Sequence, residues 1–321
     1  MEKDGFNIRS FTENDYEDIV SVHNTVYPEY KISVKELKRW DDKREDKIIF
    51  DRYVYEQNGE IVAEGVHNQS SHFYHPQKFW AEIVVLPEHR KQGIGSALYR
   101  YIMDVLEEYD PITIRGEAKE DNEEGIEFME HRGFKEDRRN WESHLYLDKF
   151  HPEEYDDLLK KVSEQGIEIK SLNELESDPD RDKKLHRLHN ILLGDIPSSE
   201  EHTDVDLEEF KKSIYDNPNL ISEAYLVAVH EGEYIGETNL WKNQEADYWD
   251  TGLTGVLKEY RGRGIATALK VKSLKYAKEK GCPYTKTWND STNVGMLYIN
   301  KKLGFEQKPA WINFVKYMKQ G

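Results

Sequence analysis

A glycine-rich stretch occurs twice in this chain. The first copy, Arg90 to Gly95, reads RKQGIG, and the second, Arg261 to Ala266, reads RGRGIA. Each copy follows an apolar run that favours a strand and precedes apolar residues at helical spacing. This order suits phosphate binding, because glycines let a ligand approach the backbone and the first N–H groups of a helix have no partners. We therefore predict one phosphate-binding turn in each half of the chain.

The two copies belong to a longer internal repeat. An offset of 171 residues relates four pairs: Arg90 and Arg261, Asn122 and Asn293, Gly133 and Gly304, and Phe134 and Phe305. One register kept over about forty residues indicates a duplicated domain rather than a short solenoid period. We expect an N-terminal domain over residues 1–148, a connecting helix over 149–166 and a C-terminal domain over 167–321.

Strand-prone runs before each turn are joined by short turns. Asn58-Gly59 separates two such runs in the first half, and Glu231-Gly232 does so in the second. An Asn-Gly pair between strand-prone runs is a strong hairpin signal. The strand that leads into each glycine turn therefore comes from a β-hairpin and not from a βαβ crossover.

Composition restricts the partners of the chain. Its 321 residues carry a formal net charge of −18, which disfavours binding to nucleic acid or anionic lipid and favours cationic partners such as amines. Cys282 is the single cysteine, so an internal disulfide and an all-cysteine metal site are excluded. The start of the sequence lacks the features of a signal peptide, and no apolar run has the length of a membrane span. We expect a cytoplasmic protein.

The glycine turns differ from the nucleotide-binding motifs. The dinucleotide fingerprint needs glycine or alanine at its sixth place, where this chain has Leu98 in one copy and Thr267 in the other. The lysine and hydroxyl residue of a Walker loop are also missing. A Rossmann-type nucleotide site is therefore disfavoured.

The pattern R-x-x-G-x-G/A after a strand, followed by Asn and then Gly-Phe, resembles the acetyl-CoA signature of the GCN5-related N-acetyltransferase (GNAT) superfamily. The resemblance covers nearly the whole chain, as two domains in tandem. The second half, with N-x-x-M-L-x-x-N-x-x-L-G-F from Asn293 to Phe305, looks most like the acetyltransferases related to mycothiol synthase. The resemblance implies an α/β (α+β) fold with two tandem domains. Each would have a mixed, mostly antiparallel sheet flanked by helices, with CoA entering where two strands splay.

The resemblance also implies which residues bind acetyl-CoA. Backbone N–H groups of the turns would hold the pyrophosphate, the arginines would add positive charge, strand ends would pair with the pantetheine arm, and two asparagines would lie close to the cofactor. The residues are Val84, Val85, Arg90, Lys91, Gln92, Gly93, Ile94, Gly95, Ser96 and Asn122 in the first half, and Gly255, Val256, Arg261, Gly262, Arg263, Gly264, Ile265, Ala266, Thr267 and Asn293 in the second.

The acid and the base are less clearly marked. Many family members carry a tyrosine acid four places before the Gly-Phe glycine, where this chain has Met129 and Asn300. Glu237 and Asp250 are the base candidates of the second half. The alternatives are an exposed strand residue or a structural hydrogen-bond acceptor for Glu237, and a turn cap for Asp250.

The first half offers two further base candidates, Glu64, the counterpart of Glu237, and Glu82. Its histidines His67, His72 and His75 lack metal-ligand spacing, and we expect exposed loop histidines and no metal site.

The function we expect is acetyl transfer from acetyl-CoA to an amine by direct attack, with the fuller motif placing catalysis in the C-terminal domain. The alternative is a non-catalytic CoA-binding or regulatory protein with degenerate acetyltransferase domains. The acceptor, a small-molecule or peptide amine, stays open. So does the choice between a monomer whose halves form a pseudo-dimer and a homodimer.

Overall fold

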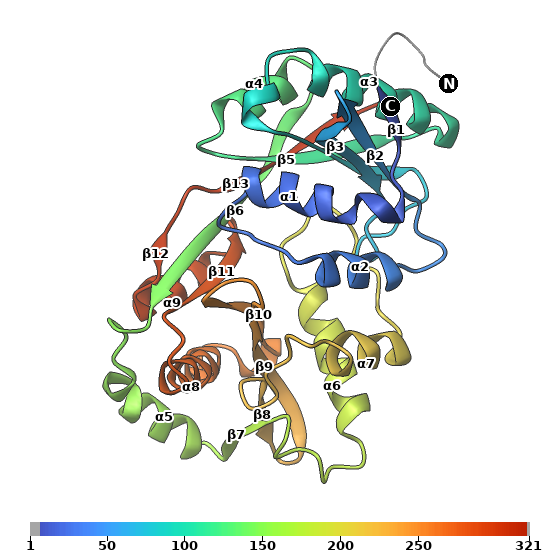
Figure 1. Cartoon of the computed structure of the whole chain (residues 1–321). Helices are drawn as coiled ribbons and strands as arrows, with labels where there is room; N and C mark the ends of the chain where they lie inside the picture. Colours follow the sequence, from blue (N-terminus) through green and yellow to red (C-terminus); the bar gives the residue numbers. More distant parts are fainter. Residues whose placement is uncertain (1–6, 320–321) are drawn as a thin grey trace. The chain divides into compact units, whose positions relative to one another are not determined.

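The structure of the chain, a computed structural model, describes residues 7–319 and divides into two compact units (Figure 1). Unit 1 combines residues 7–138 with residues 311–319, and unit 2 is Arg139–Ala310. Each unit contains its own group of paired strands and its own helices. The predicted class, two mixed α/β domains in tandem, is confirmed.

Unit 1 contains six neighbouring strands in the order β1-β2-β3-β4-β5-β13, among which only the pair β4–β5 is parallel. The strands are β1 (Ile8–Ser10), β2 (Phe50–Gln57), β3 (Glu60–Asn68), β4 (Lys78–Val85), β5 (Thr113–Lys119) and β13 (Trp311–Tyr317). The helices are η1 (Glu13–Asp15), α1 (Tyr16–Val26), α2 (Val34–Asp42), η2 (Pro87–His89), α3 (Ile94–Leu106), η3 (Glu107–Tyr109) and α4 (Glu123–Glu130).

Unit 2 repeats this plan with the strand order β6-β11-β10-β9-β8-β7, and β12 also pairs with β6. The strands are β6 (Lys135–Tyr146), which belongs to unit 2 from Arg139 on, β7 (Ile167–Ser171), β8 (Leu226–His230), β9 (Glu233–Lys242), β10 (Tyr248–Val256), β11 (Tyr284–Asp290) and β12 (Glu306–Gln307). The helices are η4 (Pro152–Tyr155), α5 (Asp156–Ser163), α6 (Arg181–Gly194), α7 (Leu207–Tyr215), η5 (Lys258–Tyr260), α8 (Ile265–Glu279) and α9 (Val294–Leu303).

The compact units differ from the predicted sequence domains at both ends of the second repeat. Residues 140–146 of β6 pair with β11 of unit 2, although they precede the predicted boundary at 148. Strand β13 pairs with β5 of unit 1 over residues 113–119, although it ends the second repeat. Hydrophobic alternation marks a strand but not the sheet edge that it joins, so the repeat alone does not reveal this exchange.

The predicted connecting segment, residues 149–166, contains α5, and this helix is part of unit 2. Leu158 and Val162 of α5 pack in one apolar cluster with Ile265 and Leu269 of α8. The helix is followed by Gly166 with a φ of +75°, as expected for a residue that closes a helix. The segment therefore contributes to the core of unit 2 rather than only linking two domains.

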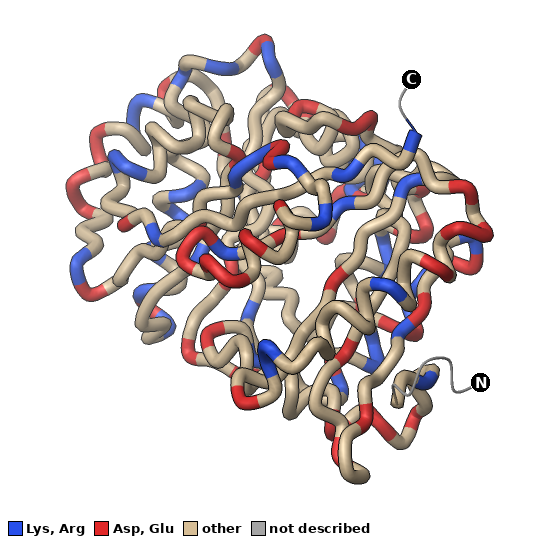
Figure 2. The backbone as a smooth tube through the Cα atoms, turned by 90° about the horizontal axis from the view of Figure 1, so that it is seen from above, with Lys and Arg blue, Asp and Glu red and all other residues tan. Residues whose placement is uncertain are grey.

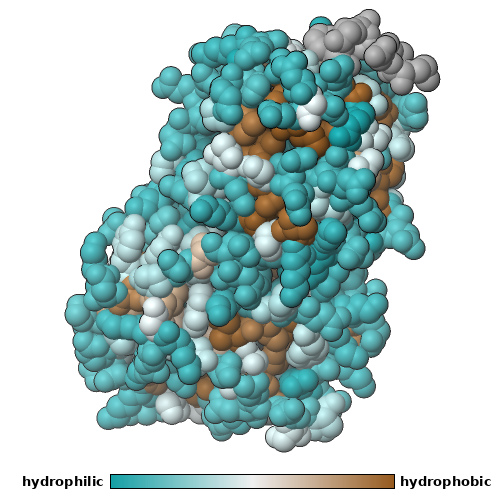
Figure 3. Space-filling view, in the orientation of Figure 1, coloured by the Kyte–Doolittle hydropathy of each residue, from teal (hydrophilic) through white to brown (hydrophobic). Residues whose placement is uncertain are grey.

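Helices cover both faces of each sheet. In β2 of unit 1, Tyr53 packs in the cluster that contains α3, whereas its neighbour Val54 packs in the cluster that contains α1. Neighbouring residues of a strand point to opposite faces, so the two clusters lie on opposite sides of the sheet. On the face shown in Figure 3, apolar residues appear only as separate patches between hydrophilic ones.

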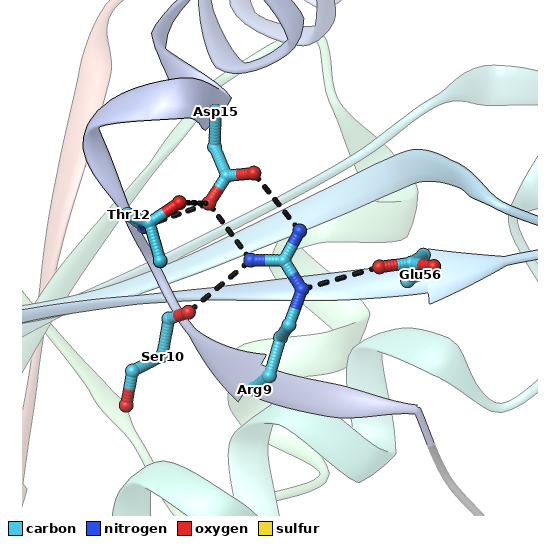
Figure 4. A network of polar contacts seen from close by, with 5 residues as sticks. All are labelled: Arg9, Ser10, Thr12, Asp15 and Glu56. Carbon is cyan, nitrogen blue, oxygen red and sulfur yellow. Dashed lines mark hydrogen bonds and ion pairs between the residues drawn. The ribbon is translucent and has the colours of Figure 1, made fainter.

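Charged residues of both signs are interspersed along the backbone (Figure 2). One polar network fixes the entry to α1: Arg9 donates to both carboxylate oxygens of Asp15, at 2.7 and 2.9 Å, and to Glu56 at 3.1 Å (Figure 4). Asp15 also accepts from the backbone N–H of Thr12. Within residues 7–319, no helix combines the length and the hydropathy that crossing a bilayer requires.

Candidate active site

The two glycine turns have nearly the same backbone conformation. Arg90 and Arg261 have φ/ψ values of −69°/163° and −68°/160°. Gly93 and Gly264, which cap α3 and α8, are left-handed with φ values of 87° and 83°. A left-handed residue just before each helix explains why both copies carry glycine at this place.

In both turns the arginine holds the end of the preceding strand. The Nε of Arg90 donates to the carbonyl of Val85 at 3.1 Å, and that of Arg261 donates to Val256 at 2.9 Å. Arg261 also forms an ion pair with Asp195 at 2.5 Å. The arginines thus have a structural role in addition to the positive charge that was predicted for them.

The turns present unpaired backbone donors. Among residues 7–319, the backbone N–H groups of residues 91–96 and 262–267 donate no hydrogen bond. The first three N–H groups of α3 and of α8 are included, and they carry the positive end of the helix dipole. This donor set fits a pyrophosphate, so the residues present suit the CoA site that the sequence predicts.

The sheets splay beside these turns. Strands β4 and β5 pair only over residues 78–80 with 113–115, and β10 and β11 pair only over residues 248–250 with 284–286. Beyond these pairs the ends of β4 and β10, including Val84 and Gly255, pair on one edge only, with β3 and β9, among the strands that the structure describes. An extended thioester arm can add to such an edge through backbone hydrogen bonds.

Glu237 of β9 is enclosed in unit 2. Its side chain is 0% exposed and accepts hydrogen bonds from the hydroxyl of Tyr225 and from Nδ1 of His189, both at 2.7 Å. It pairs across the strands with Gly255, whereas Asp250 pairs with Trp241. The two predicted catalytic carboxylates therefore lie on one face of the sheet, but four residues of strand, about 13 Å, separate them.

The corresponding place in unit 1 is an acidic cluster. Glu64 of β3 is nine-tenths buried, and loss of solvation, with the charge of Glu82, raises its pKa to about 8. Desolvation also raises the pKa of Glu82, and it raises that of Glu117 to about 7 although both residues present surface to solvent. The nearest cation to Glu64 is Arg52, whose Nε lies 3.6 Å from the carboxylate. Among residues 7–319, no histidine forms a hydrogen bond with Glu64 as His189 does with Glu237.

The repeated asparagines cap helices. Asn122 accepts from the N–H of Gly125 at 3.0 Å, and Asn293 accepts from Met296 at 3.2 Å. Asn300, at the place of the family tyrosine, is buried and donates to Asn289 at 2.6 Å. The asparagines at 122 and 293 thus have a capping role that explains them without a ligand, and their contact with CoA remains a prediction.

One expectation about the histidines was wrong. His67 is fully buried on β3, with Nε2 3.2 Å from Asp51, because it faces the core in the alternation of that strand. In the described part of the chain, no group of three or more His, Cys, Asp or Glu side chains has the arrangement of a metal site.

The sequence did not point to His189 and Tyr225. His189 lies in a helical run whose leucines at 185, 188 and 192 mark the buried face, and Tyr225 reads as an ordinary core aromatic. Only the recurrence of the glutamate at 64 and 237 directs attention to their surroundings. The repeat offers no second copy of the histidine that could have marked it.

Comparison with known proteins identifies both halves. The model of an acetyltransferase (GNAT) domain matches residues 50–136, and that of the acetyltransferase (GNAT) family matches residues 185–305. An uncharacterized N-acetyltransferase of Methanocaldococcus jannaschii is 41% identical over 61 residues, which are 18% of this chain and 27% of that relative. The chain thus matches only about a quarter of the length of that curated relative.

Solved structures show the same fold over the whole chain. A GCN5-related N-acetyltransferase from Sphaerobacter thermophilus has a TM-score of 0.72 and 18% identity, covering 100% of this chain and 98% of its own. A tandem GNAT protein from the clavulanic acid biosynthesis pathway has a TM-score of 0.76 and 16% identity, covering 98% and 99%. The chain belongs to the GCN5-related N-acetyltransferase superfamily and carries two GNAT domains in tandem.

Proposed function

We propose that the protein is an N-acetyltransferase that transfers the acetyl group of acetyl-CoA to an amine, and that unit 2 performs the reaction. Acetyltransferase domains are established for both halves of the chain. The donor, the acceptor class and the catalytic unit form the proposal. A cytoplasmic location and a small-molecule or peptide amine as acceptor go with it.

The observation that carries the proposal is the combination of a splayed strand pair with a donor-rich turn in unit 2. Within the described part of the chain, the N–H groups of residues 262–267 donate no hydrogen bond, and β10 has no partner strand at Gly255 on the β11 side. A pyrophosphate would bind to the first and a pantetheine arm to the second. Glu237, opposite Gly255, supplies a carboxylate next to the place where the thioester would lie.

Unit 2 is favoured over unit 1 by the surroundings of this carboxylate. Glu237 is held by two hydrogen-bond donors, whereas Glu64 has one arginine at 3.6 Å and two further carboxyl groups nearby. Bound acetyl-CoA supplies an activated acyl group. The chain itself must bind the cofactor, orient the amine and accept its proton.

The second candidate function is a CoA-binding or regulatory protein without turnover. The observation that favours it is Asn300, a buried amide at the place where many family members carry a tyrosine acid. An amide cannot protonate the leaving thiolate. Turnover separates the two functions, because only an enzyme consumes acetyl-CoA when an amine is added.

Cofactor binding is tested by calorimetry with CoA on Gly264→Asp and Gly264→Asn. Both side chains tolerate the left-handed backbone, and they differ in charge. A carboxylate within about 4 Å of a phosphate charge costs about 4 kcal/mol at an effective dielectric constant of 20, so we expect Gly264→Asp to lose at least tenfold more affinity than Gly264→Asn. Equal affinities of the two variants for CoA would rule out the turn of unit 2 as the pyrophosphate site.

A further inference from the structure

Two carboxylates at equivalent places in the repeat, Glu64 and Glu237, have different hydrogen-bond partners. Glu64 and Glu237 both follow the hairpin turn of their unit and both face the strand that leads into the glycine turn, opposite Val84 and Gly255. Only Glu237 has a histidine as partner. Duplication explains the shared glutamate but not the added imidazole.

The contact between Glu237 and His189 fixes the tautomer of the imidazole. A carboxylate only accepts hydrogen bonds, so Nδ1 of His189 carries the proton that it donates at 2.7 Å. The neutral ring then has its lone pair on Nε2. No partner for Nε2 lies among the residues that the structure describes, and the side chain of His189 is 17% exposed.

Tyr225 binds the oxygen of Glu237 that His189 does not contact. Its ring is fully buried, and its hydroxyl donates to the second oxygen of Glu237 at 2.7 Å. Burial raises the pKa of Tyr225 well above its ordinary value, so the hydroxyl keeps its proton as a donor. The buried carboxylate is thereby satisfied on both oxygens, and its direction toward His189 is fixed.

Helix α6 brings His189 over the predicted thioester position. Leu192 lies so close to Gly255 that a Cβ on this glycine would be 2.9 Å from the leucine Cδ2. His189 and Leu192 are three residues apart, so they share one side of α6. The helix therefore covers the paired residues Glu237 and Gly255 and holds the imidazole on that face of β9 and β10.

We propose that His189 is the general base of unit 2 and that Glu237 and Tyr225 are positioning residues that hold its imidazole. The inference rests on the proposed function. The amine proton passes to Nε2, the nitrogen lone pair forms the C–N bond to the acetyl carbon, and the C–S bond breaks. The electron pair of the C–S bond leaves with sulfur. The CoA thiolate takes up one proton, equivalent to the one that His189 accepted and then releases, which leaves the free thiol and a neutral imidazole.

The other titratable groups around His189 are few. His202 and Asp204 lie on the connection between α6 and α7, and the charge of His189 contributes to a lowered pKa of His202, after desolvation. His186, one turn earlier on α6, contacts the carbonyl of Val205. The ring of Phe210 on α7 lies 5.2 Å from that of His189 and is apolar. None of these groups replaces Glu237 as the partner of Nδ1.

The test compares His189→Asn with His151→Asn. An asparagine at 189 keeps a donor for Glu237 but removes the base. His151 forms an exposed pair with Glu153 at 3.2 Å in the same unit and is the matched control. At pH 7 we expect His189→Asn to lower kcat at least 100-fold with the KM for acetyl-CoA unchanged within twofold, and to remove the acidic limb of the pH profile. His151→Asn should keep both.

A second readout does not depend on activity. The ¹⁵N shifts of the His189 ring in the free protein should show Nδ1 protonated, and Glu237→Ala, which removes the acceptor, should introduce the other tautomer. Should His189→Asn lower the melting temperature, His189→Gln takes its place in the assay. If the wild type turns over and the His189 variant keeps a near-normal kcat and an intact acidic limb, His189 is not the general base, and the proposed function is unaffected. No turnover with any amine would overturn the proposed function as well.

Discussion

The twin glycines before α3 and α8 allow a test of local packing with an internal control. Gly93 and Gly264 have φ values of 87° and 83°, so an alanine at either place meets the same left-handed strain, about 1–2 kcal/mol. The surroundings differ. Apart from its chain neighbours, no described residue has a heavy atom within 4 Å of a Cβ at 93, whereas a Cβ at 264 would lie 2.7 Å from Cδ1 of Leu158 on α5.

The extra cost of Gly264→Ala follows from this contact. Ordinary carbon–carbon contacts are about 3.5–4.0 Å, so the Leu158 methyl group must move by about 1 Å. Overpacking costs about 1–3 kcal/mol, and because the methyl ends a flexible side chain we expect the lower end. Gly264→Ala should therefore destabilise α8 by about 1 kcal/mol more than Gly93→Ala destabilises α3.

Hydrogen exchange measured by mass spectrometry resolves the two helices separately, which matters because the units need not unfold together. Combining Gly264→Ala with Leu158→Ala should recover about 1 kcal/mol relative to the sum of the single variants. Equal costs at 93 and 264, or additive costs with Leu158→Ala, would refute the packing of α5 against the second turn.

Two further predictions concern the pH dependence of stability. The hydrogen bond from Arg9 lowers the pKa of Asp15 to about 2, so its contribution is present above about pH 4 and lost as the pH falls toward 2. Asp15→Asn should lower the free energy of unfolding in urea by about 1–2 kcal/mol at pH 7, a value that allows for the solvent exposure of Arg9. If wild type and variant still differ by this amount at pH 2, the prediction is wrong. Burial lowers the pKa of Lys270 to about 7, so between pH 7 and 10 the unfolded chain binds a proton that the folded chain lacks, and wild-type stability rises with pH. Lys270→Met should be more stable than the wild type by a few kcal/mol at pH 7, and its stability should not rise between pH 7 and 10. A variant that is less stable than the wild type at pH 7 would show that interactions of the lysine offset the cost of its burial.

The sequence predicted the features that depend on backbone geometry. Glycine at 93 and 264 is required by a left-handed residue before a helix, and the Asn58-Gly59 turn forms the predicted hairpin. Because such requirements are local, the repeat and the two turns could be recognised without a structure.

What the sequence could not show depends on contacts between distant segments. The exchange of β13 into the sheet of unit 1 is a matter of edge pairing, which strand alternation does not encode. His189 meets Glu237 from 48 positions away, and its helix carries the leucines of an ordinary core face. The recurrent glutamate was visible in the sequence, but the partner that distinguishes the two copies was not.

Acetyl transfer itself gives the most direct test of the account. Purified protein is incubated with acetyl-CoA and a panel of amines that includes small amines, amino acids and peptide N-termini, and both the released CoA thiol and the acetylated product are measured. The account predicts release of CoA that requires an amine, matched by acetylated product, and lost in Gly264→Asp. Tight binding of CoA with no amine-dependent release for any acceptor class would contradict it and would favour the CoA-binding protein instead.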